Sequence, residues 1–138
     1  METIKNIQAE IIEDFEMFDD WMQKYEFLID LGKELPALDA KHKTEDNLIK
    51  GCQSRVWLYA EKQDGKIIYT ADSDAIMTKG IIAILIRVLS EQKAVEIISA
   101  DLSFIDTIGL KEQLSATRAN GLVSMIKKMK LYALAYQN

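Results

Sequence analysis

Hydrophobic residues recur along the first part of the chain with the spacing of amphipathic helices. Isoleucines and phenylalanines stand three and four residues apart from Ile4 to Phe18, which predicts a helix with one apolar face. Asp20 is placed to cap a second helix, and Gly32 and Pro36 mark the end of that helix. Its predicted buried stripe is Trp21, Tyr25, Leu28 and Ile29.

The middle of the chain changes to the pattern of a loop followed by a β-hairpin. Residues 38–46 are polar and predict a loop, residues 47–50 form a short extended run, and residues 51–54 form a tight connection. Residues 55–61 predict a strand, and the dipeptide Asp64-Gly65 is a strong hairpin signal because both residues tolerate a positive φ. The strand should return over residues 66–70 and form a small antiparallel sheet with one covered face.

The remainder of the chain is predominantly helical by pattern. Residues 75–90 predict a central helix, and Ile76, Ile81, Leu85 and Leu89 suit a helix that is apolar around much of its circumference. Gly80 lowers helix propensity there, so we interpret it as a point of close backbone packing. Short helices are expected at 94–98 and 104–108. A last helix should start near Ser115 and turn Leu122, Met125, Ile126 and Met129 inward.

Length and charge narrow the range of partners. The chain has 138 residues, which suits one domain over residues 1–138, and its net charge of −5 argues against general affinity for nucleic acid. Charges interrupt the first residues where an export signal would need an apolar core, so we expect a cytoplasmic protein. The apolar run at 80–86 is far shorter than the roughly 20 residues of a membrane span, so no membrane association is expected.

Cys52 is the only cysteine, in the stretch GCQSRVWL at the mouth of the predicted strand. It cannot form an internal disulfide, and one cysteine with one histidine cannot build a zinc site of the usual kind. The thiol is therefore either inert packing, the commoner fate of a lone cysteine, or a nucleophile. As a nucleophile it would gain from Gly51, which allows close approach, and from nearby charge on Lys50, Arg55 or His42.

Three other groups of residues have a structural and a chemical interpretation. His42 could act as a base for Cys52, but no third group to orient it is evident, and a solvated loop histidine is the simpler interpretation. Asp72 and Asp74 precede a helix, so we expect capping rather than metal binding. Arg118 lies near a helix start, where the dipole disfavours a cation. It is either solvated or has a role outside the helix.

These stretches together resemble the SufE family of sulfur acceptors, partners of cysteine desulfurases in iron-sulfur cluster assembly. The resemblance covers nearly the whole chain. It is most specific in NLIKGCQSRVWL and also runs through YEFLIDLGKELPAL, DSDA, Lys79-Gly80 and LSATRANGLVSM. One departure is Ala116, where the family often has proline at the first helical position.

The resemblance implies an α+β fold, with a small antiparallel sheet covered by N- and C-terminal helices and the cysteine on a loop leading into a strand. It implies that Cys52 accepts persulfide sulfur from a SufS-type cysteine desulfurase, stimulates that enzyme and passes the sulfur to a SufBCD-type scaffold. Arg118 and Asp74 would support the site or the docking surface, and Gly51, Gln53 and Ser54 would shape a loop that moves. No metal or cofactor is required, because a persulfide on one thiol is itself the product.

Three alternatives compete with this interpretation. The chain could be an allosteric activator of a desulfurase that carries no sulfur, in which case Cys52 would be dispensable. It could be a cluster scaffold, although clusters are usually held by several thiolates. A thiol protease is the last alternative. The sequence leaves open whether the protein is a monomer or a homodimer.

Overall fold

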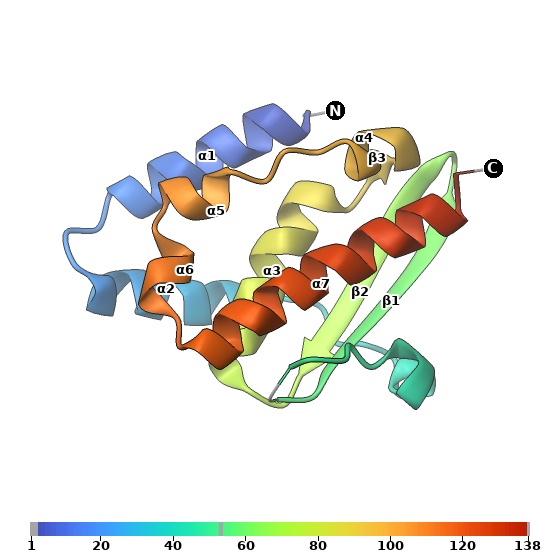
Figure 1. The fold of residues 1–138 in the computed structure, drawn as a ribbon, viewed down its shortest axis with the longest axis horizontal. Helices are drawn as coiled ribbons and strands as arrows, with labels where there is room; N and C mark the ends of the chain where they lie inside the picture. Colours follow the sequence, from blue (N-terminus) through green and yellow to red (C-terminus); the bar gives the residue numbers. More distant parts are fainter. Residues whose placement is uncertain (1–2, 53, 138) are drawn as a thin grey trace.

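The computed structural model describes residues 3–52 and 54–137, in which a hairpin-based sheet is packed against helices (Figure 1). The elements in chain order are α1 (Ile4–Glu16), α2 (Trp21–Lys33), η1 (Ala40–His42), η2 (Glu45–Asn47), β1 (Val56–Gln63), β2 (Lys66–Ser73), α3 (Ile76–Leu89), β3 (Gln92–Lys93), α4 (Ala94–Ile98), α5 (Phe104–Thr107), α6 (Leu110–Gln113) and α7 (Ala116–Ala135).

The sheet is antiparallel with the strand order β1-β2-β3. Its hairpin turns at Asp64 and Gly65, whose φ angles of 51° and 80° are those of a tight turn that matches strand twist. The predicted hairpin is therefore confirmed, although β2 continues to Ser73, where the sequence pattern stopped at Thr70. The two-residue strand β3 was not predicted, because two residues carry no alternating pattern.

One face of the hairpin is buried against helices α3 and α7, which run alongside it (Figure 1). Alternate strand residues form this face because successive strand side chains point to opposite sides. They are Val56, Leu58, Ala60, Ile67, Tyr69 and Ala71. Each large side chain buried here contributes about 1.5–3 kcal/mol. The expected α+β fold, with a small antiparallel sheet covered by helices, is confirmed.

Three tyrosine hydroxyls connect α7 to the hairpin. Tyr132 and Tyr136 donate to the backbone carbonyls of Leu58 and Ala60 in β1, each at 3.1 Å. In the opposite direction, the buried hydroxyl of Tyr69 in β2 donates to a carbonyl of α7 at 2.6 Å. Each bond contributes on the order of 1 kcal/mol. Together they fix α7 along the free edge of β1.

Helices α2 and α3 cross at a point where each contributes a glycine to the contact. A Cβ built on Gly32 would lie 2.8 Å from the backbone nitrogen of Gly80, and one built on Gly80 would collide with the Leu28 carbonyl oxygen. The interpretation of Gly80 as a point of close backbone packing is confirmed. The prediction that Gly32 and Pro36 mark the end of this helix is confirmed, because α2 ends at Lys33, one residue after the buried Gly32.

The predicted helices are present, but some of their apolar residues are less buried than the pattern suggests. Asp20 caps α2 by accepting a hydrogen bond from the Gln23 N–H at 2.9 Å, and Ser115 caps α7, so Ala116 still begins that helix. Ile76, in the first turn of α3, is 63% exposed although the helix is apolar around much of its circumference. In α2 only Leu28 of the predicted stripe is fully buried.

We predict that Gly80→Ala lowers the free energy of unfolding by about 1–3 kcal/mol, because the added methyl group forces α2 away from α3. Urea denaturation measures the change. Asp30→Ala, on the exposed face of α2, is the control and should stay within about 0.5 kcal/mol of wild type. Equal stability of Gly80→Ala and wild type would contradict the close packing described above.

Candidate functional site

Cys52 stands at the tip of a loop whose base is closed by backbone pairing. The Ile49 N–H donates to the Val56 carbonyl at 2.8 Å, and Leu48 forms an isolated bridge with Trp57. Gly51 has a φ of +89°, a region that residues with side chains rarely adopt. The predicted position of the cysteine, on a short loop leading into a strand, is confirmed for the described residues.

The loop rests on α7 at two points that leave no room for a side chain. A Cβ built on Gly51 would lie 2.8 Å from the Ser124 hydroxyl oxygen, and a Cβ built on Gly121 would lie 3.3 Å from the Cys52 sulfur. The sulfur lies within hydrogen-bonding distance of the Gly121 carbonyl oxygen, at 3.7 Å. The main chain of α7 therefore forms one wall of the cysteine's surroundings.

A cavity of about 40 Å³ adjoins the thiol. Its walls come from the loop, from α3 and from α7. The lining residues are Cys52, Ser54, Thr78, Ile81, Thr117, Arg118, Gly121 and Met125. Cys52 is half-buried there, and this burial raises the pKa of its thiol above the ordinary value. The resting site therefore favours the neutral thiol over the thiolate.

Arg118 is the charged residue of this cavity lining, and it lies in the first turn of α7 with an exposed side chain. Its backbone N–H donates to the capping hydroxyl of Ser115 at 3.2 Å. Within residues 3–52 and 54–137 its guanidinium group has no carboxylate partner at ion-pair distance. The structure thus brings together Cys52, Ser54 and Arg118 from the predicted site. Gln53, also predicted there, lies outside the described residues.

Asp74 fastens the start of β1 to the end of β2. Its carboxylate accepts a hydrogen bond from the Arg55 N–H at 3.1 Å, and its own N–H donates to the Arg55 carbonyl at 3.2 Å. The expectation that Asp74 caps α3 is wrong, because Ala75 is the N-cap residue and no side chain caps it. Asp74 lies next to the cysteine loop through Arg55 and does not line the cavity.

Asp72 also does not cap the helix, since β2 extends past it. Its carboxylate forms ion pairs with Lys43 at 2.8 Å and with Lys79 at 3.3 Å. Partial burial works to raise the pKa of Asp72, but the hydrogen bonds from Lys43 and Ser73 and the charge of Lys79 outweigh it and lower the pKa. Asp72 therefore links the 38–46 loop, the sheet and α3.

His42 stacks on Tyr59 with ring centroids 3.6 Å apart and an interplanar angle of 14°. The expectation of a solvated loop histidine is therefore wrong, because the ring is half-buried by this contact. The cavity lining includes neither His42 nor the other proposed sources of charge, Lys50 and Arg55. The structure gives no support to a Cys52–His42 pair.

The sequence analysis missed the residues of α3 and α7 that form the cavity walls. Thr78 and Ile81 face the cysteine from α3, while Gly121 and Met125 face it from α7. Met125 was predicted to be buried, but nothing in the pattern connected it with Cys52. Gly121 had one usable signal, since a glycine in the middle of a helix lowers helix stability unless close packing requires it.

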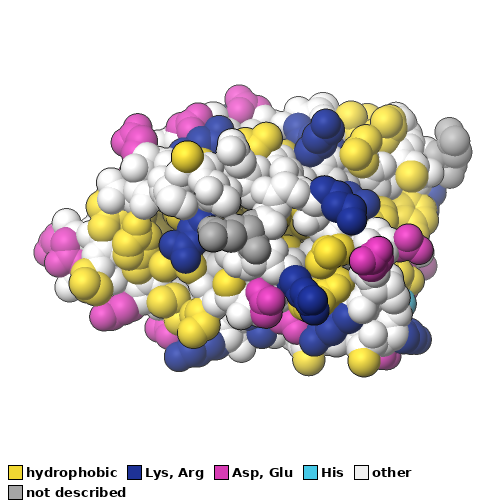
Figure 2. Space-filling model, turned by 60° about the horizontal axis from the view of Figure 1, so that its bottom comes forward, with side chains coloured by type: hydrophobic (Ala, Val, Ile, Leu, Met, Phe, Trp, Pro, Cys, Tyr) yellow, Lys and Arg dark blue, Asp and Glu magenta, His cyan; other side chains and the backbone are white. Residues whose placement is uncertain are grey.

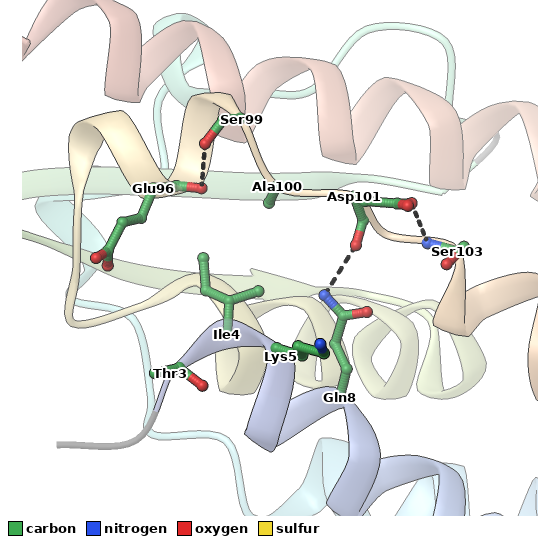
Figure 3. Close-up of a pocket in the computed structure, with 9 residues that line it drawn as sticks. All are labelled: Thr3, Ile4, Lys5, Gln8, Glu96, Ser99, Ala100, Asp101 and Ser103. Atoms are coloured by element: carbon green, nitrogen blue, oxygen red, sulfur yellow. Dashed lines mark hydrogen bonds between the residues drawn. The ribbon is translucent and has the colours of Figure 1, made fainter.

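A larger cavity, of about 480 Å³, lies between α1 and the segment after α4 (Figure 3). Two hydrogen bonds join polar groups of its lining. The Gln8 side chain donates to the Asp101 carbonyl at 3.0 Å, and the Asp101 carboxylate accepts from the Ser103 N–H at 3.0 Å. Cys52 is not among its lining residues, so this cavity is separate from the thiol.

The fold and site define an α+β protein that presents one half-buried thiol on a loop, next to a glycine with a positive φ. The sequence model of SufE, described as an Fe-S metabolism associated domain, matches residues 9–133. The chain belongs to the SufE family. It is 39% identical over 126 residues to an uncharacterized SufE-like protein of Rhizobium meliloti, with 88% of this chain and 90% of the relative covered.

The chain is also similar to two further proteins, one in sequence and one in fold. The chain is 37% identical over 123 residues to the sulfur acceptor protein CsdE of Escherichia coli, with 88% of this chain and 79% of the relative covered. A solution structure of a hypothetical protein from Thermus thermophilus superposes with a TM-score of 0.78 at 16% identity, covering 94% of each chain, which shows the shared fold. Among the described helices, none has the length and hydropathy to cross a membrane.

We predict that Asp74→Ala speeds amide hydrogen exchange at residues 54–56, because the Arg55 N–H loses its acceptor. The loss of unfolding free energy should be about 0.5–1.5 kcal/mol. Asp74→Asn is the matched control, since its side-chain oxygen can still accept the bond, and it should exchange nearly as wild type does. Equal exchange in both variants would show that the bond does not hold the loop.

Proposed function

We propose that this protein accepts sulfur on Cys52 from a SufS-type cysteine desulfurase. One observation carries the proposal: the only cysteine of the chain lies at a cavity on a glycine-hinged loop, with an arginine that has no described ion-pair partner in the same lining. The printed name of the Escherichia coli relative, a sulfur acceptor protein, supports the same chemistry.

The proposed reaction is a thiol–persulfide exchange. The Cys52 thiolate attacks the outer sulfur of the desulfurase persulfide, Enz–S–SH, so that a new S–S bond forms on Cys52 and the enzyme's S–S bond breaks. The enzyme's inner sulfur leaves as a thiolate with the bonding electron pair. The products are Cys52–S–SH and Enz–S⁻, and no external oxidant or reductant is consumed. Neither a metal nor a cofactor takes part.

The neighbouring residues have distinct parts in this proposal. Gly51 supplies the backbone freedom for the loop to swing out, because its positive φ lies in a region that glycine adopts without strain. Arg118 stabilises the anionic sulfur outside the cavity, and Ser54 and Gln53 shape the loop. Asp74 acts indirectly, by holding Arg55 at the base of the loop.

The onward acceptor we propose is a SufBCD-type cluster scaffold, and binding of this protein stimulates the desulfurase. The protein works as one domain over residues 1–138 in the cytoplasm, as a monomer or homodimer. Basic, acidic and hydrophobic side chains are interspersed on the end of the molecule brought forward in Figure 2, from which β1 and α7 start. A mixed surface of this kind suits a protein partner better than a nucleic acid.

We predict that Cys52→Ser abolishes sulfur acceptance and leaves the fold intact, because a hydroxyl is not ionised at neutral pH and cannot hold sulfane sulfur. The measurement is intact mass after incubation with free cysteine and a SufS-type desulfurase, in which wild type gains one sulfur atom. Circular dichroism tests the fold.

Continued sulfur gain by the serine variant would refute the carrier role. Stimulation of the desulfurase by Cys52→Ser as strongly as by wild type, with no sulfur gained by wild type, would instead favour the allosteric activator.

We predict that Arg118→Ala slows sulfur transfer several-fold while changing unfolding free energy by less than about 0.5 kcal/mol, since its side chain is exposed. Lys127→Ala removes an equal charge from an exposed position of α7 outside the cavity lining and is the control. Transfer rate and melting temperature are measured for each variant. Equal slowing by both variants would point to net charge rather than to the site.

A further inference from the structure

The contact between Cys52 and Gly121 differs from ordinary core packing in its chemistry. The sulfur lies 3.7 Å from a backbone carbonyl oxygen, a group that can accept hydrogen bonds and cannot donate them. A neutral thiol can donate its S–H to this oxygen. A thiolate has no proton to donate, and its negative charge then faces the negative end of the carbonyl dipole. The position therefore suits one protonation state of the sulfur and disfavours the other.

Apart from Arg118, the other residues that line the cavity carry no charge. From α3 the cavity is lined by Thr78 and Ile81, which carry no charge, and the loop contributes Ser54. From α7 come Thr117, Met125 and Arg118, so Arg118 is the titratable or charged side chain that lines the cavity besides Cys52 itself. Its side chain is exposed. A negative sulfur is therefore stabilised more by moving out toward solvent and Arg118 than by staying against Gly121.

Gly121 also sets how far the sulfur can enter. A Cβ at this position would stand 3.3 Å from Sγ and 3.8 Å from both Cα and Cβ of Cys52, so an alanine would press on the sulfur and touch the rest of the cysteine at ordinary contact distance. The main chain of α7 is thus both the acceptor and the wall of the inward position. Because residue 121 is a glycine, both the hydrogen-bond acceptor and the wall are main-chain atoms.

We propose that Gly121 is a positioning residue for Cys52, which holds the protonated sulfur inward through its carbonyl oxygen and releases it once the sulfur becomes an anion. The inference rests on the proposed function, because release matters only if the sulfur must meet a persulfide. It adds a condition to that function: loss of the proton and exit from the cavity are coupled, so the nucleophilic form of Cys52 is also the exposed form. The raised pKa of the half-buried thiol agrees with this coupling.

The first test is the pH profile of alkylation by iodoacetamide, which reacts with the thiolate. In wild type the rate should rise with a midpoint above that of a cysteine in an unstructured peptide. Gly121→Ala should lower the midpoint, and each unit of decrease raises the rate at pH 7 about tenfold. Val123→Ala, at a position of α7 that is 50% exposed, improves helix propensity away from the cavity and should leave the profile unchanged.

A Gly121→Ala protein that has wild-type circular dichroism and a wild-type alkylation profile overturns the proposal. A shift of equal size in Val123→Ala also overturns it, because the effect would then come from helix stability.

The second test needs no change at Gly121, in case that variant fails to fold. The backbone amide signals of Gly121 and Leu122 flank the accepting carbonyl and are followed by NMR between pH 7 and 10. In wild type they should shift with the midpoint of the thiol. In Cys52→Ser they should not shift, because a hydroxyl keeps its proton and its hydrogen bond throughout. Static wild-type signals, or the same titration in Cys52→Ser, would overturn the proposal.

These measurements use this protein alone, so they separate the inference from the proposed function. Failure of wild type to gain sulfur from the desulfurase refutes the carrier role and leaves the alkylation and NMR results unaffected. Sulfur gain by wild type combined with an unshifted Gly121→Ala profile refutes only the role of Gly121.

Discussion

The site depends on how closely the backbone of α7 approaches the loop before β1. Gly121 on the helix and Gly51 on the loop each face the other segment at a distance that excludes a side chain, with a built Cβ 3.3 Å from the Cys52 sulfur in one case and 2.8 Å from the Ser124 hydroxyl in the other. Each glycine therefore faces a side-chain atom of the other segment, the Ser124 hydroxyl oxygen or the Cys52 sulfur, with no side chain of its own between them. The thiol owes its inward position to this approach and to a single carbonyl oxygen.

The scaffold around that contact is fixed much more strongly than the contact itself. Tyr69, Tyr132 and Tyr136 bond α7 to the hairpin, and the buried face of the sheet packs against α3 and α7. The base of the cysteine loop is closed by the pairing of Ile49 with Val56 and by Asp74 on Arg55. Among the described residues, the tip contacts α7 at Gly121 and Ser124. A sulfur carrier of the proposed kind needs this division, because the tip must move while the walls stay in place.

Reactivity and protection make opposite demands on a single thiol. A reactive cysteine usually lies in an electropositive, partly exposed setting that lowers its pKa, whereas Cys52 at rest is half-buried and its pKa is raised. Arg118 is in the same cavity lining, but its charge is directed to solvent. On the proposed function, this arrangement would keep the sulfur unreactive at rest and reserve the charge of Arg118 for a sulfur that has left the cavity.

Much of the fold was predictable because it follows from local patterns. Periodic apolar residues gave α1, α3 and α7, Asp64-Gly65 gave the hairpin, and Asp20 and Ser115 gave helix starts, each through interactions within a few residues. The exceptions were elements too short to have a period, such as β3 and α6, and the burial of Ile76, which depends on what covers it. Of the site, the sequence indicated Cys52 and its loop, and the family resemblance added Arg118 and Asp74.

By itself the sequence determined that one thiol stands behind a glycine at the start of a strand, and that no second cysteine can share its chemistry. Tertiary structure alone decided what surrounds that thiol. Thr78 and Gly121 line the Cys52 cavity from helices that are distant in the chain. Asp74 bonds the backbone of Arg55 where the sequence predicted a helix cap, and His42 stacks on Tyr59. The physical reason is that these contacts join segments brought together by burial of the core. Local propensity acts over a few residues and cannot specify which segments of backbone meet across the hydrophobic core.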